Sequence, residues 1–172
     1  MIRSPRARRR AITALAALTA VPVFALPASA AALQPVTPQR QTDQADELLK
    51  LVNAERAKAG CHTPLRLSSP LQTAATEQAT YLAEHGPGNN PHIGSNGSTP
   101  LTRLRALGYT GAGAENVGLA TDAAGVVRGW LSSQGHKEAM LNCGWTITGI
   151  AYNPAPKQAL WKPVWVEVFG TG

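Results

Sequence analysis

The chain has 172 residues, with 16 Lys and Arg against 10 Asp and Glu, which gives a formal net charge of +6. One domain is the expected organisation at this length. The basic excess lies in the first thirty residues, because the stretch MIRSPRARRR alone carries five arginines. The rest of the chain has 11 basic and 10 acidic residues and no cluster of Lys and Arg. This balance excludes nucleic acid as an expected partner.

Residues 1–30 have the order of a secretory signal peptide. The basic stretch is followed by the apolar run AITALAALTAVPVFAL and then by the small residues Ala28 and Ala30. Pro22 interrupts the apolar run, which is too short to span a bilayer comfortably. We therefore expect cleavage near Ala30, a secreted, extracellular and monomeric protein, and no stable membrane span after cleavage. An uncleaved membrane anchor is the alternative.

The chain has two cysteines, Cys61 and Cys143. An even pair in an exported protein predicts one disulfide between them. Two separate buried thiols are the alternative. A bridge across this long separation stabilises the fold by roughly 4–5 kcal/mol in the chain-entropy account.

The predicted domain covers residues 42–172, after a flexible leader at 31–41 that contains two prolines and no periodic apolar face. The first helix has apolar residues at i, i+3, i+4 and i+7 and ends at Gly60. Its apolar positions are Ala45, Leu48, Leu49 and Val52. The second helix starts at Ser69, with Pro70 in its first turn. Its predicted buried face is Leu71, Ala74, Ala75, Gln78 and Leu82.

Two further helices follow from their caps. Thr99 caps a short helix that starts at Pro100, packs Leu101 and Leu104, and ends at Gly108. Thr121 or Asp122 caps the next helix, whose buried side chains are Ala123, Val126, Val127 and Trp130. The segment HKEAMLN predicts another helical turn, and Trp145 and Trp165 are expected in the core.

Most predicted strands lie late in the chain, in WTITGIAYN and VWVEVFG, with a weaker strand in GAENVGLA. The alternation in VWVEVFG leaves the face of Glu167 open. Helices first and strands last predict an α+β fold, with helices packed over a mainly antiparallel sheet.

Histidines are the residues that point to chemistry, since no nucleotide-binding loop and no G-x-S-x-G motif is present. His62 and His85 are expected to be structural or neutral. His92 lies in the turn-rich loop NNPHIGSNGSTP, and His136 follows SSQG. These two imidazoles and one carboxylate would suit zinc with an open position for water. Two unconnected histidines are the alternative.

Five motifs in order resemble the CAP superfamily of cysteine-rich secretory proteins, insect venom antigens and plant pathogenesis-related proteins. The helix LLKLVNAERAKAG carries the N-x-x-R pattern at Asn53 and Arg56. The other segments are PHIGSNGSTPLTRLRALGY, AENVG, GWLSSQGHKEAMLN and WVEVFG. AENVG resembles the family's G-E-N-[IV] strand, with Ala114 in place of glycine. The resemblance covers about residues 45–170.

The resemblance implies a three-layer α-β-α sandwich and a cleft lined by two histidines and acidic residues. By motif the cleft residues are His92, His136 and Glu115. Ser133 stands where many members carry a second glutamate. Zinc or another divalent metal, if bound, would be held by His92, Glu115 and His136 with fewer charges and lower affinity.

Two functions remain open, beside the reading that the cluster only holds the loops in place. The first is a secreted binding module for a lipid, sterol or cell-wall glycan, which is not an enzyme. The second is a zinc-dependent hydrolase that uses the same cluster to ionise a bound water. Fold analogy alone does not decide between them.

Overall fold

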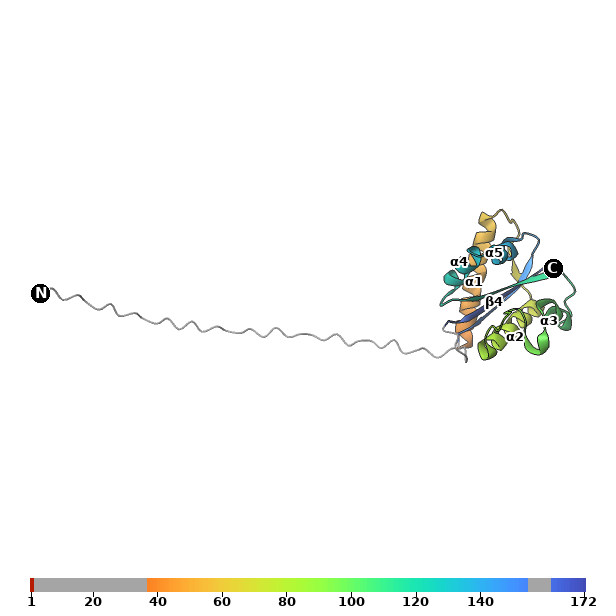
Figure 1. Cartoon of the computed structure of the whole chain (residues 1–172). Coiled ribbons are helices and arrows are strands. Elements are labelled where there is room, and N and C mark those ends of the chain that lie inside the picture. The colour runs from red at the N-terminus through yellow and green to blue at the C-terminus, as the bar shows by residue number, and fades with distance from the viewer. Residues whose placement is uncertain (2–36, 155–161) are drawn as a thin grey trace. The chain divides into compact units, whose positions relative to one another are not determined.

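Figure 1 shows a computed structural model of the chain, which describes residue 1, residues 37–154 and residues 162–172. Apart from Met1, the predicted signal peptide lies outside the described residues, as does the leader up to residue 36. Within the described ranges, no helix is long and apolar enough to cross a membrane. The elements in chain order are α1 (Pro38–Lys58), β1 (Arg66–Leu67), α2 (Ser69–His85), the 3-10 turn η1 (Ser95–Gly97), α3 (Pro100–Ala106), β2 (Gly113–Leu119), α4 (Ala123–Leu131), α5 (Gln134–Leu141), β3 (Ile147–Asn153) and β4 (Val164–Gly170).

Each of three helices starts at a side chain that caps it. Thr37 caps α1, which begins at Pro38, so the domain boundary expected at residue 42 lies inside this helix. Thr99 caps α3 in a capping box, and the Asp122 carboxylate accepts a 2.6 Å hydrogen bond from the Gly125 backbone N–H at the start of α4. The cap predicted at Thr99 is confirmed, and of the two candidates Thr121 and Asp122 the structure has Asp122 as the cap.

The sheet has four strands among the described residues, in the order β1-β3-β4-β2. Strands β2 and β3 both pair antiparallel with β4, whereas the short β1 runs parallel to β3. The prediction of an α+β fold with a mainly antiparallel sheet is confirmed. Strand β2 lies at one edge of the sheet. No further strand of the described part of the chain follows beside it, so side chains from the helical layers on the two faces can approach each other there.

Helices cover both faces of the sheet (Figure 1). On one face α1, α4 and α5 pack on a core that includes Leu48, Trp130, Met140 and Trp165. On the other face α2 and α3 pack on a second core of small and branched apolar residues, which includes Leu104. This is the α-β-α sandwich that the resemblance implied. The predicted buried face of α2 is also confirmed, including Gln78 at 0% exposure.

Close contact between α2 and β3 depends on a glycine. A Cβ placed on Gly149 would overlap backbone atoms of Leu71 and Gln72. The Gln72 carboxamide reinforces this contact, because it accepts from the Ile150 N–H at 3.1 Å and donates to the Ile150 carbonyl. Side chain and backbone together therefore hold α2 against the outer edge of β3.

The N-x-x-R motif of α1 has a structural role. Asn53 makes two hydrogen bonds with the backbone of Leu65, at 2.8 and 3.1 Å. Arg56 is 1% exposed, and its guanidinium donates to the carbonyls of Met140, Asn142 and Trp145. These bonds satisfy carbonyls in the last turn of α5 and just after it, which the helix itself leaves without partners.

The predicted disulfide Cys61–Cys143 is present and closes 82 residues of chain. It joins the end of α1 to the turn after α5, beside the carbonyls that Arg56 binds. Two expectations about packing need correction. Leu101 is 44% exposed instead of packed, and Trp145 is only partly buried at the edge of the core.

Candidate functional site

His92 lies in the loop between α2 and α3, and backbone contacts hold this loop in place. The Asn90 side chain accepts from the His92 backbone N–H at 3.0 Å. Gln78 of α2 donates to the carbonyl of Pro91 at 2.7 Å. A Cβ on Gly94 would clash with the Gln78 side chain, so the glycine lets the loop lie against α2. The backbone around His92 is therefore anchored on both sides.

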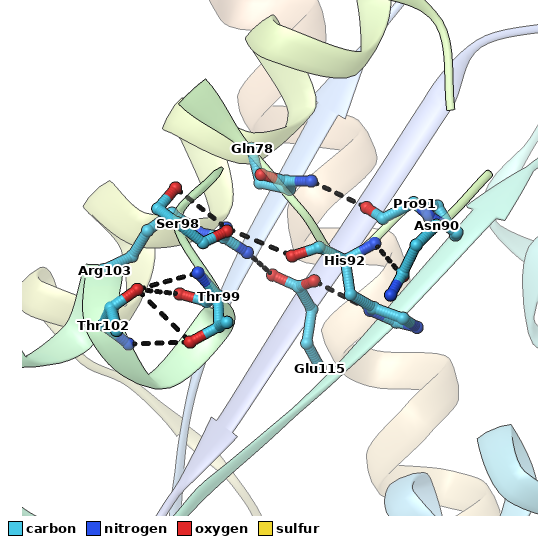
Figure 2. A network of polar contacts seen from close by, with 9 residues as sticks. All are labelled: Gln78, Asn90, Pro91, His92, Ser98, Thr99, Thr102, Arg103 and Glu115. Atoms are coloured by element: carbon cyan, nitrogen blue, oxygen red, sulfur yellow. Dashed lines mark hydrogen bonds and ion pairs between the residues drawn. The ribbon is translucent and has the colours of Figure 1, made fainter. Parts of the chain in front are cut away.

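Glu115 of β2 lies buried between two nitrogen partners (Figure 2). Its Oε1 is 2.9 Å from Nδ1 of His92, and its Oε2 accepts a 2.6 Å hydrogen bond from Nη2 of Arg103. The Glu115 side chain is 1% exposed, whereas that of His92 is 35% exposed. A buried carboxylate needs partners of this kind, because burial without them would be very costly. The motifs had placed Glu115 beside His136 and opposite His92, whereas the side-chain partners of Glu115 in the structure are His92 and Arg103.

Arg103 was not predicted as a site residue. It is 6% exposed and also donates to the carbonyls of His92 and Ser98, at 3.3 and 3.0 Å. One guanidinium therefore ties α3, the His92 loop and Glu115 together. An arginine between leucines in a short helix normally lies on the solvent side, and so the sequence pattern did not identify it. The cap at Thr99 shows that Arg103 lies in the first turns of α3, but it does not show on which side of the helix the side chain lies.

The Glu115 carboxylate selects the tautomer of a neutral His92 ring. Because the carboxylate accepts, Nδ1 of His92 carries the hydrogen, and Nε2 of a neutral ring then keeps its lone pair. That nitrogen can accept a hydrogen bond, bind a metal ion or take a proton. Each oxygen of Glu115 already has one of these partners, and its side chain is 1% exposed, so the carboxylate presents little surface to a ligand.

His136 comes from the other helical layer. It lies in the first turn of α5, and its backbone carbonyl accepts a 2.9 Å hydrogen bond from Asn116 of β2. Burial lowers the pKa of His136, and the nearby charge of His92 lowers it further. The two rings are therefore close enough to interact electrostatically. Ser133 is the N-cap residue of α5, and its carbonyl accepts from the Lys137 N–H at 2.8 Å.

The predicted metal ligands do not form a three-donor set here. Among the described residues, no group of three or more His, Cys, Asp or Glu is placed to hold one metal ion. The reason is visible at Glu115, whose second oxygen is bound by Arg103. Adjacent strand residues point to opposite faces, so Glu115 and Asn116 face different helical layers. The His92 ring therefore meets the carboxylate on one face, and on the other face Asn116 binds the backbone carbonyl of His136.

An open cavity lies beside His92. Its volume is about 490 Å³, and it is lined by His92, Thr99, Pro100, Leu101, Gly113, Ala114 and Glu115. The exposed Leu101 thus forms one wall of it. A Cβ on Gly113 would lie 2.9 Å from Cδ1 of Leu104, so the glycine lets this end of β2 lie close to α3. The cavity combines an apolar wall with one imidazole and a buried carboxylate that is paired with Arg103.

Comparison with solved structures shows the same fold in several bacterial proteins. An extracellular protein containing an SCP domain from Bacillus anthracis aligns with a TM-score of 0.66 and 19% identity, over 80% of this chain and 45% of that one. An outer surface protein from Borrelia burgdorferi aligns with a TM-score of 0.62 and 23% identity, over 75% of this chain and 92% of that one. A cysteine-rich secretory protein from Staphylococcus aureus aligns with a TM-score of 0.59 and 19% identity, over 79% of this chain and 41% of that one. The chain thus spans less than half of the Bacillus and Staphylococcus proteins.

Sequence comparison identifies the family. No curated protein matches the chain closely enough to count as a relative. The sequence model of the cysteine-rich secretory protein family, CAP, matches residues 49–169. This range covers α1 from Leu49 through almost all of β4, and it includes both histidines and Glu115. The protein therefore belongs to the CAP family of cysteine-rich secretory proteins.

Proposed function

We propose that this protein is a secreted binding module, and that the cavity beside His92 holds a lipid, sterol or cell-wall glycan ligand. One observation carries the proposal. Both oxygens of Glu115 are bound by His92 and Arg103, so the carboxylate orients the imidazole instead of facing a reactant. A polar group of the ligand would meet His92, and its apolar part would lie on Leu101 and Ala114.

Secretion is part of the proposal. The order of residues 1–30 supports it. The disulfide supports it too, because such bridges persist in oxidising compartments. The fold is also shared with bacterial proteins described as extracellular or outer-surface. Detection of the mature chain in culture medium, with its new N-terminus near residue 31, tests this part.

The zinc hydrolase is the less favoured function. A hydrolytic zinc site needs three protein ligands and a water, whereas the buried Glu115 already pairs with His92 and Arg103. His92 and His136 are then the residues that could bind zinc. Binding by two histidines alone would be weak and would supply no positioned general base. Zinc-dependent hydrolysis that the His136→Ala variant loses and wild type shows would favour this function instead.

Binding measurements with matched leucine variants test the proposed cavity. The mature protein is titrated with lipid vesicles, a sterol and soluble cell-wall fragments. Leu101→Asp places a charge in the cavity wall, while Leu119→Asp changes a leucine of similar exposure, 42% against 44%, that does not line this cavity. We expect Leu101→Asp to weaken binding about tenfold, close to 1.4 kcal/mol, and Leu119→Asp to leave it unchanged. Equal effects of the two variants would contradict the proposed cavity.

A further inference from the structure

Three polar side chains lie buried on the sheet face that α1, α4 and α5 cover. Glu167 of β4 and Thr148 of β3 are 0% exposed, and Asn116 of β2 is 1% exposed. Asn116 and Glu167 are register partners across the β2–β4 pair, so their side chains lie on the same face. Directly opposed residues in an antiparallel pair have Cβ atoms about 4.5–5.5 Å apart. The amide and the carboxyl are therefore neighbours.

If Glu167 is ionised, these three side chains have too few donor hydrogens to satisfy the buried acceptor oxygens around them. The single hydroxyl hydrogen of Thr148 has two acceptors in reach, Oε1 of Glu167 at 3.1 Å and the Val168 carbonyl at 2.9 Å. Oε2 of Glu167 and Oδ1 of Asn116 have no hydrogen-bond partner among the described residues. Both are acceptors, and both are buried. One proton on Oε2 of Glu167 can be donated to Oδ1 of Asn116, which satisfies both atoms.

Charges around Glu167 do not compensate an ionised carboxylate. From α1 the guanidinium of Arg56 faces it, but the recorded hydrogen bonds of Arg56 all go to backbone carbonyls. From β2 and β3 the facing groups are the neutral Asn116 and Thr148. Burial raises the pKa of Glu167 to about 8, and the Thr148 hydrogen bond and the Arg56 charge only partly oppose this rise. Burial and the missing hydrogen-bond donors therefore both favour the protonated carboxyl at neutral pH.

Asn116 connects this proton to the candidate site. Its Nδ2 donates to the backbone carbonyl of His136 at 2.9 Å, which leaves Oδ1 to face the other way. That orientation suits a neutral Glu167, which can donate to Oδ1. An ionised Glu167 would repel Oδ1 and attract Nδ2, and the amide would then turn away from His136.

We propose that Glu167 is a neutral carboxylic acid in the folded protein, that it donates its proton to Asn116, and that this bond positions His136 through the Asn116 amide. Glu167 is a positioning residue, since its recorded contacts are with neighbouring strands and not with the cavity beside His92. Loss of the proton at alkaline pH moves the first turn of α5. The proposal holds whichever ligand the cavity binds, because it concerns only the position of His136.

NMR titration of the folded wild-type protein from about pH 5 to about pH 10 tests the proposal. The carboxyl carbon of Glu167 should show one step near pH 8. The ring of His136 should show its own acidic step and a second step at the Glu167 midpoint, as should the side-chain NH₂ of Asn116. The rings of His62 and His85 serve as internal controls and should lack the alkaline step. A Glu167 step below pH 6, or no alkaline step at His136, would overturn the proposal.

The Glu167→Gln variant assigns the alkaline step. Glutamine keeps the size of the side chain and can donate to Asn116 at every pH. The variant should therefore lose the alkaline step at His136 and retain the acidic one. An alkaline step that persists in the variant would show that another group causes it, and the proposal would be wrong. If the variant does not fold, the wild-type titration still decides, because both steps are recorded on the unmodified chain.

Discussion

Replacement of Glu167 by Gln should change how the stability of the fold depends on pH. The folded chain holds a proton on Glu167 up to about pH 8, whereas the unfolded chain releases it near the ordinary value of 4.5. A raised carboxyl pKa makes the free energy of unfolding fall as the pH rises through this window. One pKa unit corresponds to about 1.4 kcal/mol, so the total fall is at most about 5 kcal/mol.

Between about pH 5 and about pH 7.5 this linkage amounts to roughly 3 kcal/mol. The glutamine variant has no such proton to release. Between these two pH values its free energy of unfolding should therefore fall by roughly 3 kcal/mol less than that of the wild type. Urea unfolding of both proteins at the two pH values, with the disulfide intact, measures the difference. Other titrating groups are common to both proteins and cancel.

Glu77→Gln is the matched control, because Glu77 lies exposed on α2. This variant should follow the wild-type pH dependence. If Glu167→Gln also follows the wild type, then Glu167 is ionised in the folded state, and the reasoning from burial and missing hydrogen-bond partners is refuted.

Three other changes follow from single contacts. Arg103→Met should lower the free energy of unfolding by about 3 kcal/mol in urea titrations, since it leaves a buried carboxylate without its partner. The exposed Arg128→Met should have little effect, and equal losses would contradict the role of Arg103. Reduction of Cys61–Cys143 should cost roughly 4–5 kcal/mol in the chain-entropy account, and an unchanged denaturation midpoint would argue against it. Gly149→Ala should lower the thermal midpoint, because its Cβ meets the backbone of α2, and it should cost about 1–3 kcal/mol. A variant as stable as wild type would show that α2 can move away.

Local signals in the sequence were sufficient for most of the fold. Thr99 and Asp122 could be recognised as caps because each precedes a helical apolar pattern and its side chain reaches the free N–H groups. The face of α2 followed from its spacing. Strand β1 was not predicted, because a strand of two residues, Arg66–Leu67, has no measurable alternation.

The face of Glu167 could not be predicted for a related reason. All seven residues of β4 are buried, since helices cover both faces of this central strand. Alternation between apolar and polar residues therefore carries no information about direction there. Only the register with β2 shows that Glu167 lies on the same face of the sheet as Asn116.

The candidate site was predicted in part. His92 and Glu115 came from motifs, and the structure brings their side chains within 2.9 Å. Arg103 was missed, because its burial depends on where α3 lies relative to β2. The charge pattern of α3 alone does not contain that information. The position of His136 likewise depends on packing between α5 and the edge strand.

Chemical-shift mapping with the tightest ligand from the binding panel tests the central claim most directly. The account predicts that the largest shifts on the mature protein occur at His92, Leu101 and Ala114, around the cavity beside β2. Another groove lies between α1, α2 and β3, and its lining includes Thr76 and Tyr152. Largest shifts in that second groove, with His92 and Leu101 unmoved, would contradict the assignment of the His92 cavity as the binding site.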